Sequence, residues 1–333
     1  MQYRKLGQLG TPISAIGYGA MSLTNFYGPT DANGAHAVLA ACMDLGIDHL
    51  DTSNVYGGGL SEERIGSFLA KQGKQAGDFF KIATKAGMGR DADGNRKFNN
   101  APEYLAAELD GSLKRLGVEQ VELFYIHRRE AERPIEEVTE TLAGFVKAGK
   151  IRQFGFSEIA PTSLAVASTV HPVGAVQSEY SLSARSPEMG LVQRTKELGT
   201  TLVAFCPVGR GLLTDTPPNF EKAQTVDFLK NNPRFLEPNL SRNLAAVEDF
   251  QKMAADMGTS TSALAIAWLL HQGDHVLPIP GTRSVEHLKE LAAGADLKLS
   301  EADLAAIEEL LPIGWAHGDR YNVGQWVGPE KYC

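Results

Sequence analysis

The chain has 333 residues, 43% of them hydrophobic and 22% charged, and carries a formal net charge of −8 at pH 7. These fractions are typical of a globular protein and exclude a disordered or fibrous one. The negative net charge disfavours a surface for nucleic acid, because phosphate binding needs a basic field.

The sequence gives no indication of a secretory signal, a membrane span, a disulfide framework or a metal site. The first residues, MQYRKLGQLG, contain no apolar core of a secretory signal, and no apolar run reaches the ~18 residues of a membrane span. Cys42, Cys206 and Cys333 are too few and too scattered for a disulfide framework or a zinc site. His271 and His275 have no further ligand nearby, so we expect no metal there. We therefore expect a cytoplasmic protein without a membrane or metal partner.

Short strand-like runs alternate with helical patterns almost from end to end of the chain. Eight runs are candidate strands: 15–19, 47–51, 79–85, 121–127, 151–157, 174–180, 201–207 and 275–280. Several are continuously apolar, as parallel strands buried on both faces are. This alternation predicts a parallel sheet with right-handed helical crossovers.

The clearest helix is expected in APEYLAAELDGSLKRLGV (101–118), where four leucines share one face and Gly117 follows the last turn. The leucines are Leu105, Leu109, Leu113 and Leu116. Another helix is expected to begin at Ser300, which opens the capping pattern Ser-x-x-Asp.

Two closures of the sheet compete, an open doubly wound sheet and an eight-stranded barrel. An open sheet for a dinucleotide would carry G-x-G-x-x-G after its first strand and an acid about 20 residues later. Here GYGAMS (17–22) lacks the third glycine, and AVLAA (37–41) contains no acid. Eight repeats without a linker favour a (β/α)8 barrel, formed as a single domain by residues 1–333.

Three segments account for the length beyond an ordinary barrel. Residues 1–14 are expected to form a hairpin that plugs the lower end of the barrel. Residues 208–243 and 312–333 are much longer than ordinary connections and contain many Gly, Pro or Asn residues. Long loops of this kind are commonly functional, so we expect these two to border a substrate site.

Polar residues stand at the ends of three successive strands. Asp51 and Tyr56 follow the second strand, Lys85 ends the third and His127 follows the fourth. The carboxyl ends of all barrel strands meet at one mouth, so these four side chains are expected to converge. Each alone has a commoner structural role, as a cap, an ion-pair partner or a packed side chain. The set of four on adjacent strands is what indicates a site.

The four residue types suit proton transfer to a carbonyl that is being reduced. The ammonium of Lys85 is expected to lower the pKa of the Tyr56 phenol, ordinarily near ~10. Asp51 would orient the lysine, and His127 would donate a hydrogen bond to a substrate oxygen. No side chain supplies hydride, so hydride must come from an organic cofactor. A rival hypothesis makes Lys85 a Schiff-base nucleophile, as in class I aldolases.

The other strand ends offer groups for such a cofactor. Ser157, Glu158 and Gln177 are suited to hold a carboxamide, and Phe205 to stack on a flat ring. Gly281, Thr282 and Arg283 stand at the start of the last barrel helix, where backbone N–H groups and a guanidinium are suited to phosphate.

Together these segments resemble the aldo-keto reductase superfamily, over essentially the whole chain. The matching motifs are GIDHLDTSNVYGGGLSEERIG, KIATK, VELFYIHR, RPIEEVTETLAGFVKAGKIRQFGFSE, VQSEYSL, CPVGRG and LPIPGTRSVEHLKE. The resemblance implies NADPH-dependent, reversible reduction of an aldehyde or ketone. It also implies that Asp51, Tyr56, Lys85 and His127 form the catalytic tetrad, with Tyr56 as the general acid.

The resemblance further implies where the cofactor lies along the barrel mouth. The nicotinamide would stack on Phe205, with residues 19–21 near its ribose. The implied contact residues are Gly19, Ala20, Met21, Asp51, Ser157, Glu158, Gln177, Phe205, Cys206, Pro207, Val208, Gly209, Arg210, Gly281, Thr282, Arg283 and His287.

The chain departs from the family pattern within this set. Glu158 replaces the usual asparagine and Phe205 the usual tyrosine, while Gly281-Thr282 replaces Lys-Ser and His287 replaces arginine. A carboxylate at 158 can accept a hydrogen bond from a carboxamide but cannot donate one. Arg283 is then left to carry much of the discrimination for a 2′-phosphate. We expect NADPH to be the preferred cofactor, with weaker discrimination against NADH than in the most familiar members of the superfamily.

A third hypothesis is a nucleotide-sensing module, as the potassium-channel β subunits of the superfamily partly are. The complete tetrad counts against it.

Substrate choice is expected to depend on residues 128–133, 211–243 and 312–333. The aromatic residues of the last segment favour an apolar or aromatic carbonyl substrate. No nucleic-acid partner is expected, and the oligomeric state stays open.

Overall fold

The structure, a computed structural model, describes residues 1–90, 94 and 96–332. Within these residues, a sheet of eight parallel strands runs in the spatial order β12-β11-β10-β9-β8-β5-β4-β3. The strands are β3 (Tyr18–Gly19), β4 (His49–Asp51), β5 (Lys81–Ala86), β8 (Val121–Ile126), β9 (Ile151–Ser157), β10 (Ala175–Glu179), β11 (Thr201–Phe205) and β12 (Val276–Pro278). Each predicted run contains or overlaps one of them, so the strand predictions are confirmed.

The first and last strands close the sheet into a barrel. The N–H of Gly17 donates to the carbonyl of Pro278, and that of Gly19 to the carbonyl of Pro280, both at 2.9 Å. β12 is shorter than the predicted run because Pro278 and Pro280 have no N–H to extend the ladder. A side chain at Gly19 would lie 2.8 Å from the Ile279 carbonyl oxygen, so this seam needs a glycine.

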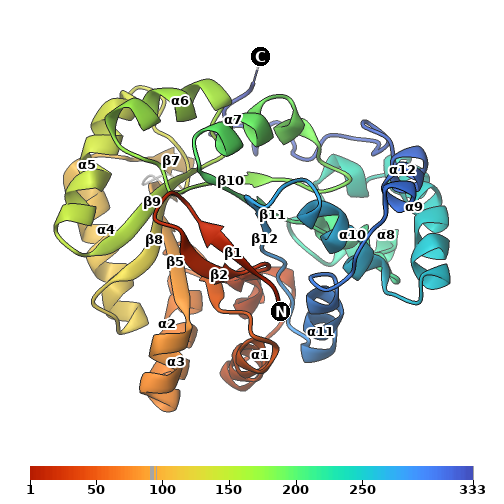
Figure 1. The fold of residues 1–333 in the computed structure, drawn as a ribbon, viewed down its shortest axis with the longest axis horizontal. Coiled ribbons are helices and arrows are strands. Elements are labelled where there is room, and N and C mark those ends of the chain that lie inside the picture. The colour runs from red at the N-terminus through yellow and green to blue at the C-terminus, as the bar shows by residue number, and fades with distance from the viewer. Residues whose placement is uncertain (91–93, 95, 333) are drawn as a thin grey trace.

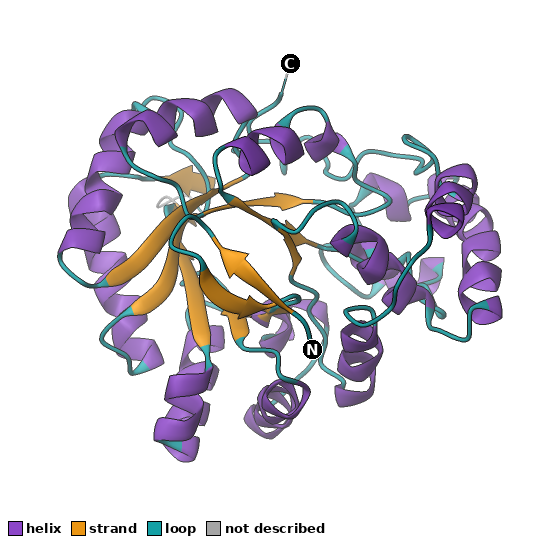
Figure 2. Cartoon of the chain, in the orientation of Figure 1, coloured by secondary structure: helices purple, strands orange, loops and turns teal. Residues whose placement is uncertain are grey.

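Helices surround the strands, as Figures 1 and 2 show. They are α1 (Ala32–Leu45), α2 (Leu60–Gln72), α3 (Lys74–Phe79), α4 (Pro102–Leu116), α5 (Ile135–Lys147), α6 (Pro161–Val170), α7 (Leu191–Glu197), α8 (Phe220–Gln224), α9 (Asn239–Asp256), α10 (Thr261–Leu270), α11 (Val285–Ala293) and α12 (Glu301–Leu310). The expected leucine face of α4 is buried, and Gly117 ends that helix in the left-handed region. Ser300 and Asp303 form the expected capping box of α12.

A hairpin of β1 (Tyr3–Leu6) and β2 (Thr11–Ser14) lies across one end of the barrel (Figure 1). Leu6 and Ile13 are fully buried and belong to the same cluster as the inward-facing residues Leu123 and Val203. Because the hairpin fills this end, ligand access is left to the opposite mouth, where the strands have their carboxyl ends.

The opposite mouth carries elements that are additional to the eight predicted strands. A small antiparallel pair, β6 (Met88–Arg90) and β7 (Arg96–Phe98), follows β5. The segment after β11 contains α8 and has its own apolar cluster, which includes Leu212 and Phe235. Cys333, the last residue of the predicted 312–333 segment, lies outside the described residues.

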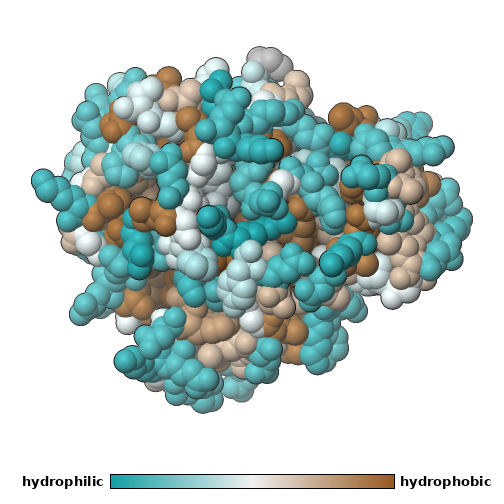
Figure 3. Space-filling view, in the orientation of Figure 1, coloured by the Kyte–Doolittle hydropathy of each residue, from teal (hydrophilic) through white to brown (hydrophobic). Residues whose placement is uncertain are grey.

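The surface gives no sign of a large apolar face on the side viewed in Figure 3, where hydrophobic residues are scattered among hydrophilic ones. Of the helices in the described part of the chain, none combines the length and apolarity that crossing a membrane requires.

Candidate active site

Asp51, Lys85 and Tyr56 form a chain of polar groups at the carboxyl end of β4 and β5, in which only Tyr56 is partly exposed. The Lys85 ammonium donates to the Asp51 carboxylate, to the Thr52 carbonyl at 2.8 Å and to the Tyr56 hydroxyl at 3.3 Å. Lys85 is fully buried and Asp51 nearly so. The three groups predicted from separate strand ends therefore do converge.

The turn after β4 determines where the Tyr56 ring points. Three glycines follow it, and all have positive φ, between 64° and 100°. The N–H of Tyr56 donates to the Ser53 carbonyl, and its own carbonyl accepts from Ser61 near the start of α2. The turn thus reverses the chain within a few residues and directs the phenol back toward Lys85.

His127 completes the predicted set. Its ring meets the Tyr56 ring edge to face, with centroids 5.7 Å apart and an interplanar angle of 79°. Its Nδ1 is hydrogen-bonded to the Ser53 hydroxyl at 3.1 Å. Ser53 was not predicted as a site residue, although its position two residues after Asp51 is a signal of the same strand end.

The electrostatics of Tyr56 differ from the expectation. Burial, followed by the nearby Asp51 carboxylate, raises the pKa of Tyr56 far above its ordinary value, and Arg128 only partly opposes this. The prediction that a lysine makes this phenol acidic is wrong for the protein alone, because desolvation outweighs the neighbouring charge. Burial likewise lowers the pKa of Lys85, against the opposing effect of Asp51.

Burial also lowers the pKa of His127 well below its usual value, and the neighbouring Arg128 and Lys85 add to the effect. The imidazole is therefore neutral at physiological pH. A neutral imidazole can donate from one ring nitrogen while the other accepts.

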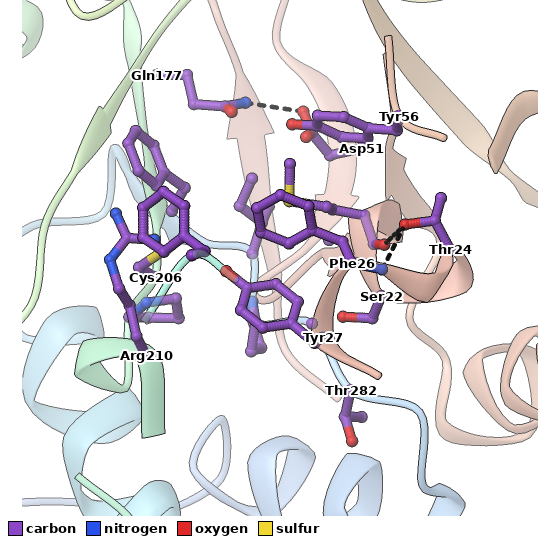
Figure 4. Close-up of a pocket in the computed structure, with 18 of the residues that line it drawn as sticks. Ser22, Thr24, Phe26, Tyr27, Asp51, Tyr56, Gln177, Cys206, Arg210 and Thr282 are labelled. Atoms are coloured by element: carbon purple, nitrogen blue, oxygen red, sulfur yellow. Dashed lines mark hydrogen bonds between the residues drawn. The ribbon is translucent and has the colours of Figure 1, made fainter. Parts of the chain in front are cut away.

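A pocket of about 1640 Å³ opens beside these residues. It brings together most of the predicted site: Gly19, Met21, Asp51, Tyr56, His127, Ser157, Gln177, Phe205, Cys206, Pro207, Val208, Arg210, Gly281, Thr282, Arg283 and His287. Figure 4 shows Asp51 and Tyr56 at one end of the drawn pocket and Thr282 at the other. Of the predicted residues, Ala20, Lys85, Glu158 and Gly209 lie behind the lining.

Ser157 is the last residue of β9, and Gln177 lies opposite it within β10. The Gln177 amide donates to Asp51 at 2.8 Å, a contact drawn in Figure 4. The Ser157 hydroxyl accepts from the Arg128 guanidinium at 3.1 Å. Both side chains are buried yet border the pocket, which leaves them in place to meet a ligand.

Glu158 has a different environment from its neighbour. It has a positive φ of 58°, and its carboxylate accepts from the Ser178 hydroxyl at 3.2 Å and the Glu179 N–H at 2.8 Å. Its second oxygen pairs with Arg320 of the C-terminal segment. With its acceptors taken, Glu158 is left out of the cofactor contacts that we propose below.

The last residue of β11 contributes an aromatic ring, and the loop after it contributes a buried guanidinium. Phe205 is partly exposed to the pocket, and burial raises the pKa of the adjacent Cys206 thiol to about 12, which keeps it neutral. Arg210 is buried with a positive φ of 59°, and it pairs with Glu179 at 2.8 Å.

The predicted phosphate end lies at the start of α11. The Ser284 hydroxyl caps the helix by accepting from the His287 N–H at 3.2 Å. Arg283 donates to the Pro29 carbonyl at 2.8 Å and thereby reaches across to the segment that follows β3. A side chain at Gly281 would lie 2.5 Å from the Ser22 hydroxyl, so only glycine fits this approach.

Sequence reasoning predicted Ala20 and Met21 in the segment between β3 and α1 but missed the residues that follow them. Thr24, Phe26 and Tyr27 line the pocket, and Figure 4 shows the two rings reaching toward its centre. The Phe26 ring also meets that of Phe228, with centroids 5.7 Å apart, which links this segment to the one after β11. The adjacent aromatic residues in NFYG (25–28) were the available signal.

The fold and the site together define a barrel oxidoreductase, and the comparisons with known proteins agree. The model of the aldo/keto reductase family matches residues 15–312, nearly the whole chain. The chain therefore belongs to the aldo/keto reductase family.

Individual relatives support the same assignment. The chain is 38% identical to the aldo-keto reductase yakc [NADP(+)] of Schizosaccharomyces pombe, over 96% of this chain and 94% of that protein. It is similar to the solved structure of a glycerol dehydrogenase from Gluconobacter oxydans, with a TM-score of 0.81, 27% identity and coverage of 93% and 94%. An aldo-keto reductase from Bacillus halodurans shares the fold, with a TM-score of 0.77 at 24% identity and coverage of 98% and 99%.

Proposed function

We propose that the protein reversibly reduces an aldehyde or ketone to an alcohol with NADPH, and that Tyr56 is the proton donor. The observation that carries this proposal is the continuous contact from Asp51 through Lys85 to the Tyr56 hydroxyl, which ends in the wall of a large pocket.

The residues of the pocket fit a phosphorylated nicotinamide cofactor. Ser157 and Gln177 offer hydroxyl and amide groups for the carboxamide, and Phe205 offers a flat face for the ring. At the far end, the start of α11 and the Arg283 guanidinium suit phosphate. The S. pombe relative, whose name includes NADP(+), supports the same cofactor. When bound, this cofactor supplies the hydride that no side chain can provide.

The raised pKa of Tyr56 is compatible with its role as an acid. A phenol that stays protonated at neutral pH holds a proton ready for the oxygen of the carbonyl, on which negative charge develops during reduction. The phenolate left behind would be stabilised by the hydrogen bond from the Lys85 ammonium. Asp51 orients that ammonium, and alcohol oxidation runs the same proton transfer in reverse.

The neutral His127 would assist at the same oxygen. If Ser53 donates to Nδ1, the ring proton is carried on Nε2, which has no other partner in the described part of the chain. A hydrogen bond from Nε2 would then hold the carbonyl oxygen next to the Tyr56 hydroxyl.

The Schiff-base hypothesis is less well supported. The Lys85 side chain is fully buried and is not among the residues that line the pocket. Its ion pair with Asp51 also opposes the lowering of its pKa by burial. A Schiff-base nucleophile needs a neutral amine that the substrate can reach.

The direct test is a panel of aldehydes and ketones assayed for NADPH oxidation, preceded by a fluorescence titration of the protein with NADPH. We expect saturable binding and turnover of at least one carbonyl. Binding without turnover across a broad panel would favour the nucleotide-sensing hypothesis. Absence of binding would contradict the proposal.

A further inference from the structure

Three cations near the catalytic end of the pocket are neutralised by carboxylates of the described residues. Lys85 pairs with Asp51, Arg210 with Glu179, and Arg320 with Glu158 and Glu179. Arg128 also lines the pocket, but it forms no ion pair with any carboxylate of residues 1–90, 94 and 96–332.

The guanidinium of Arg128 is nevertheless held in place. Its Nη1 donates to the carbonyl of His127 at 2.6 Å and to the hydroxyl of Ser157 at 3.1 Å. Its aliphatic stem passes Gly328, where an added Cβ would lie 3.3 Å from the Arg128 Cδ. The chain thus positions this cation directly after the proposed catalytic histidine.

Part of the guanidinium remains available to a ligand. The Nε and Nη2 atoms have no hydrogen-bond partner among the residues that the structure describes, and neither is a buried unpaired atom. Glu158 is one candidate to neutralise Arg128, since Arg320 and, to a smaller extent, Arg128 lower the pKa of its carboxyl group. The oxygens of Glu158 are, however, already taken by Arg320, Ser178 and Glu179.

A rigid guanidinium with two unused donor nitrogens matches the two oxygens of a carboxylate. The proposed cofactor does not supply this anion here, because its carboxamide is neutral and its phosphates suit Arg283 at the other end of the pocket. The anion must then come from the substrate, next to the carbonyl that Tyr56 protonates.

We propose that Arg128 binds a carboxylate of the substrate, and that the preferred substrates are aldehydes or ketones that carry a carboxylate. This inference rests on the proposed function. Tyr104 and Tyr321 line the same pocket, so an aromatic or extended apolar body between carbonyl and carboxylate is compatible with its walls.

The test compares 4-formylbenzoate with its methyl ester, which has the same aldehyde and ring but no charge. Both are assayed with NADPH on the wild type, Arg128→Met and Arg128→Lys. Arg152→Met is the matched control, because Arg152 is exposed, pairs with Glu122 at 3.4 Å and lies outside the pocket.

We expect the wild type to have a higher kcat/KM for the carboxylate than for the ester. Arg128→Met should lower kcat/KM for the carboxylate about tenfold or more beyond its effect on the ester, the size expected for a lost hydrogen bond to a charged group. For Arg128→Lys, the ratio of kcat/KM for the carboxylate to that for the ester should lie between the ratios of the wild type and Arg128→Met. Arg152→Met should keep the wild-type ratio.

The outcomes separate the two proposals. If neither aldehyde is reduced and no carbonyl of the wider panel is, the proposed function fails. If both are reduced equally well, or if Arg128→Met lowers both equally, the inference about Arg128 is overturned while the proposed function stands.

Discussion

The Lys85 ammonium lies 3.3 Å from the Tyr56 hydroxyl oxygen, and the same nitrogen contacts the Asp51 carboxylate. The lysine therefore connects a buried negative charge to the phenol. In the protein alone the phenol stays protonated, because burial and the Asp51 carboxylate raise its pKa and Arg128 only partly opposes them. The lysine's proposed role is to stabilise the phenolate once the proton has been given up.

Replacing Tyr56 by phenylalanine tests the proton donor. The variant keeps the ring that packs against His127 and loses only the hydroxyl. We expect kcat to fall about 10²- to 10⁴-fold, the usual contribution of general acid catalysis, while NADPH still binds. Steady-state rates and a fluorescence titration measure the two effects, and a variant with near-normal kcat would remove Tyr56 from the mechanism.

Replacing Lys85 by methionine tests the buried ion pair. The change leaves Asp51 charged and without its partner, so we expect the free energy of unfolding to drop by about 3–5 kcal/mol, together with a loss of turnover. Lys81→Met is the matched control, because Lys81 begins the same strand and pairs with Asp48 at 2.9 Å but is partly exposed. Chemical denaturation should show a clearly smaller loss for the control. Equal losses would contradict the prediction.

The low pKa of His127 predicts a stability effect on the acid side. As pH falls through the unfolded-state pKa of ~6.5, the unfolded chain takes up a proton that the folded imidazole does not, so stability is lost. His127→Gln removes this loss. Between about pH 7.5 and about pH 5.5, the wild type should lose about 1.4 kcal/mol more than the variant. Denaturation curves at both pH values measure the difference, and parallel losses would show that His127 titrates normally.

Arg283 is expected to discriminate between the two nicotinamide cofactors. In Arg283→Gln the dissociation constant of NADPH should rise about tenfold, while that of NADH changes much less, because only NADPH carries the additional phosphate. Lys289→Gln is the control, because Lys289 is exposed on α11, which begins two residues after Arg283, and is not among the residues that line the pocket. Titrations of all three proteins with both cofactors distinguish a specific contact from a general loss of positive charge.

The pair of Glu158 and Arg320 is expected to hold the C-terminal segment against the barrel. Arg320→Met should lower the free energy of unfolding by about 3–5 kcal/mol, because it leaves the buried Glu158 carboxylate without its cation, while Glu179 keeps Arg210. Adding Glu158→Gln should recover part of the loss. If instead Glu158→Gln weakens NADPH binding without changing stability, Glu158 contacts the cofactor after all.

The sequence by itself determined the barrel and indicated the proposed catalytic set. Apolar runs that alternate with amphipathic helices bury enough surface only as a parallel sheet covered by helices, and closure brings every strand's carboxyl end to one mouth. The converging positions of Asp51, Tyr56, Lys85 and His127 followed from that rule, and the structure brings them into contact.

Only the tertiary structure decided what the neighbouring charges do. Glu158 looked like a cofactor contact because it follows Ser157, but its partner Arg320 lies 162 residues away in the sequence. The pKa of Tyr56 depends on how completely the phenol is desolvated. Whether Arg128 finds a carboxylate among the described residues depends on which of them other cations have already taken. Strand ends can be read from local patterns, whereas burial and charge pairing result from contacts between distant segments.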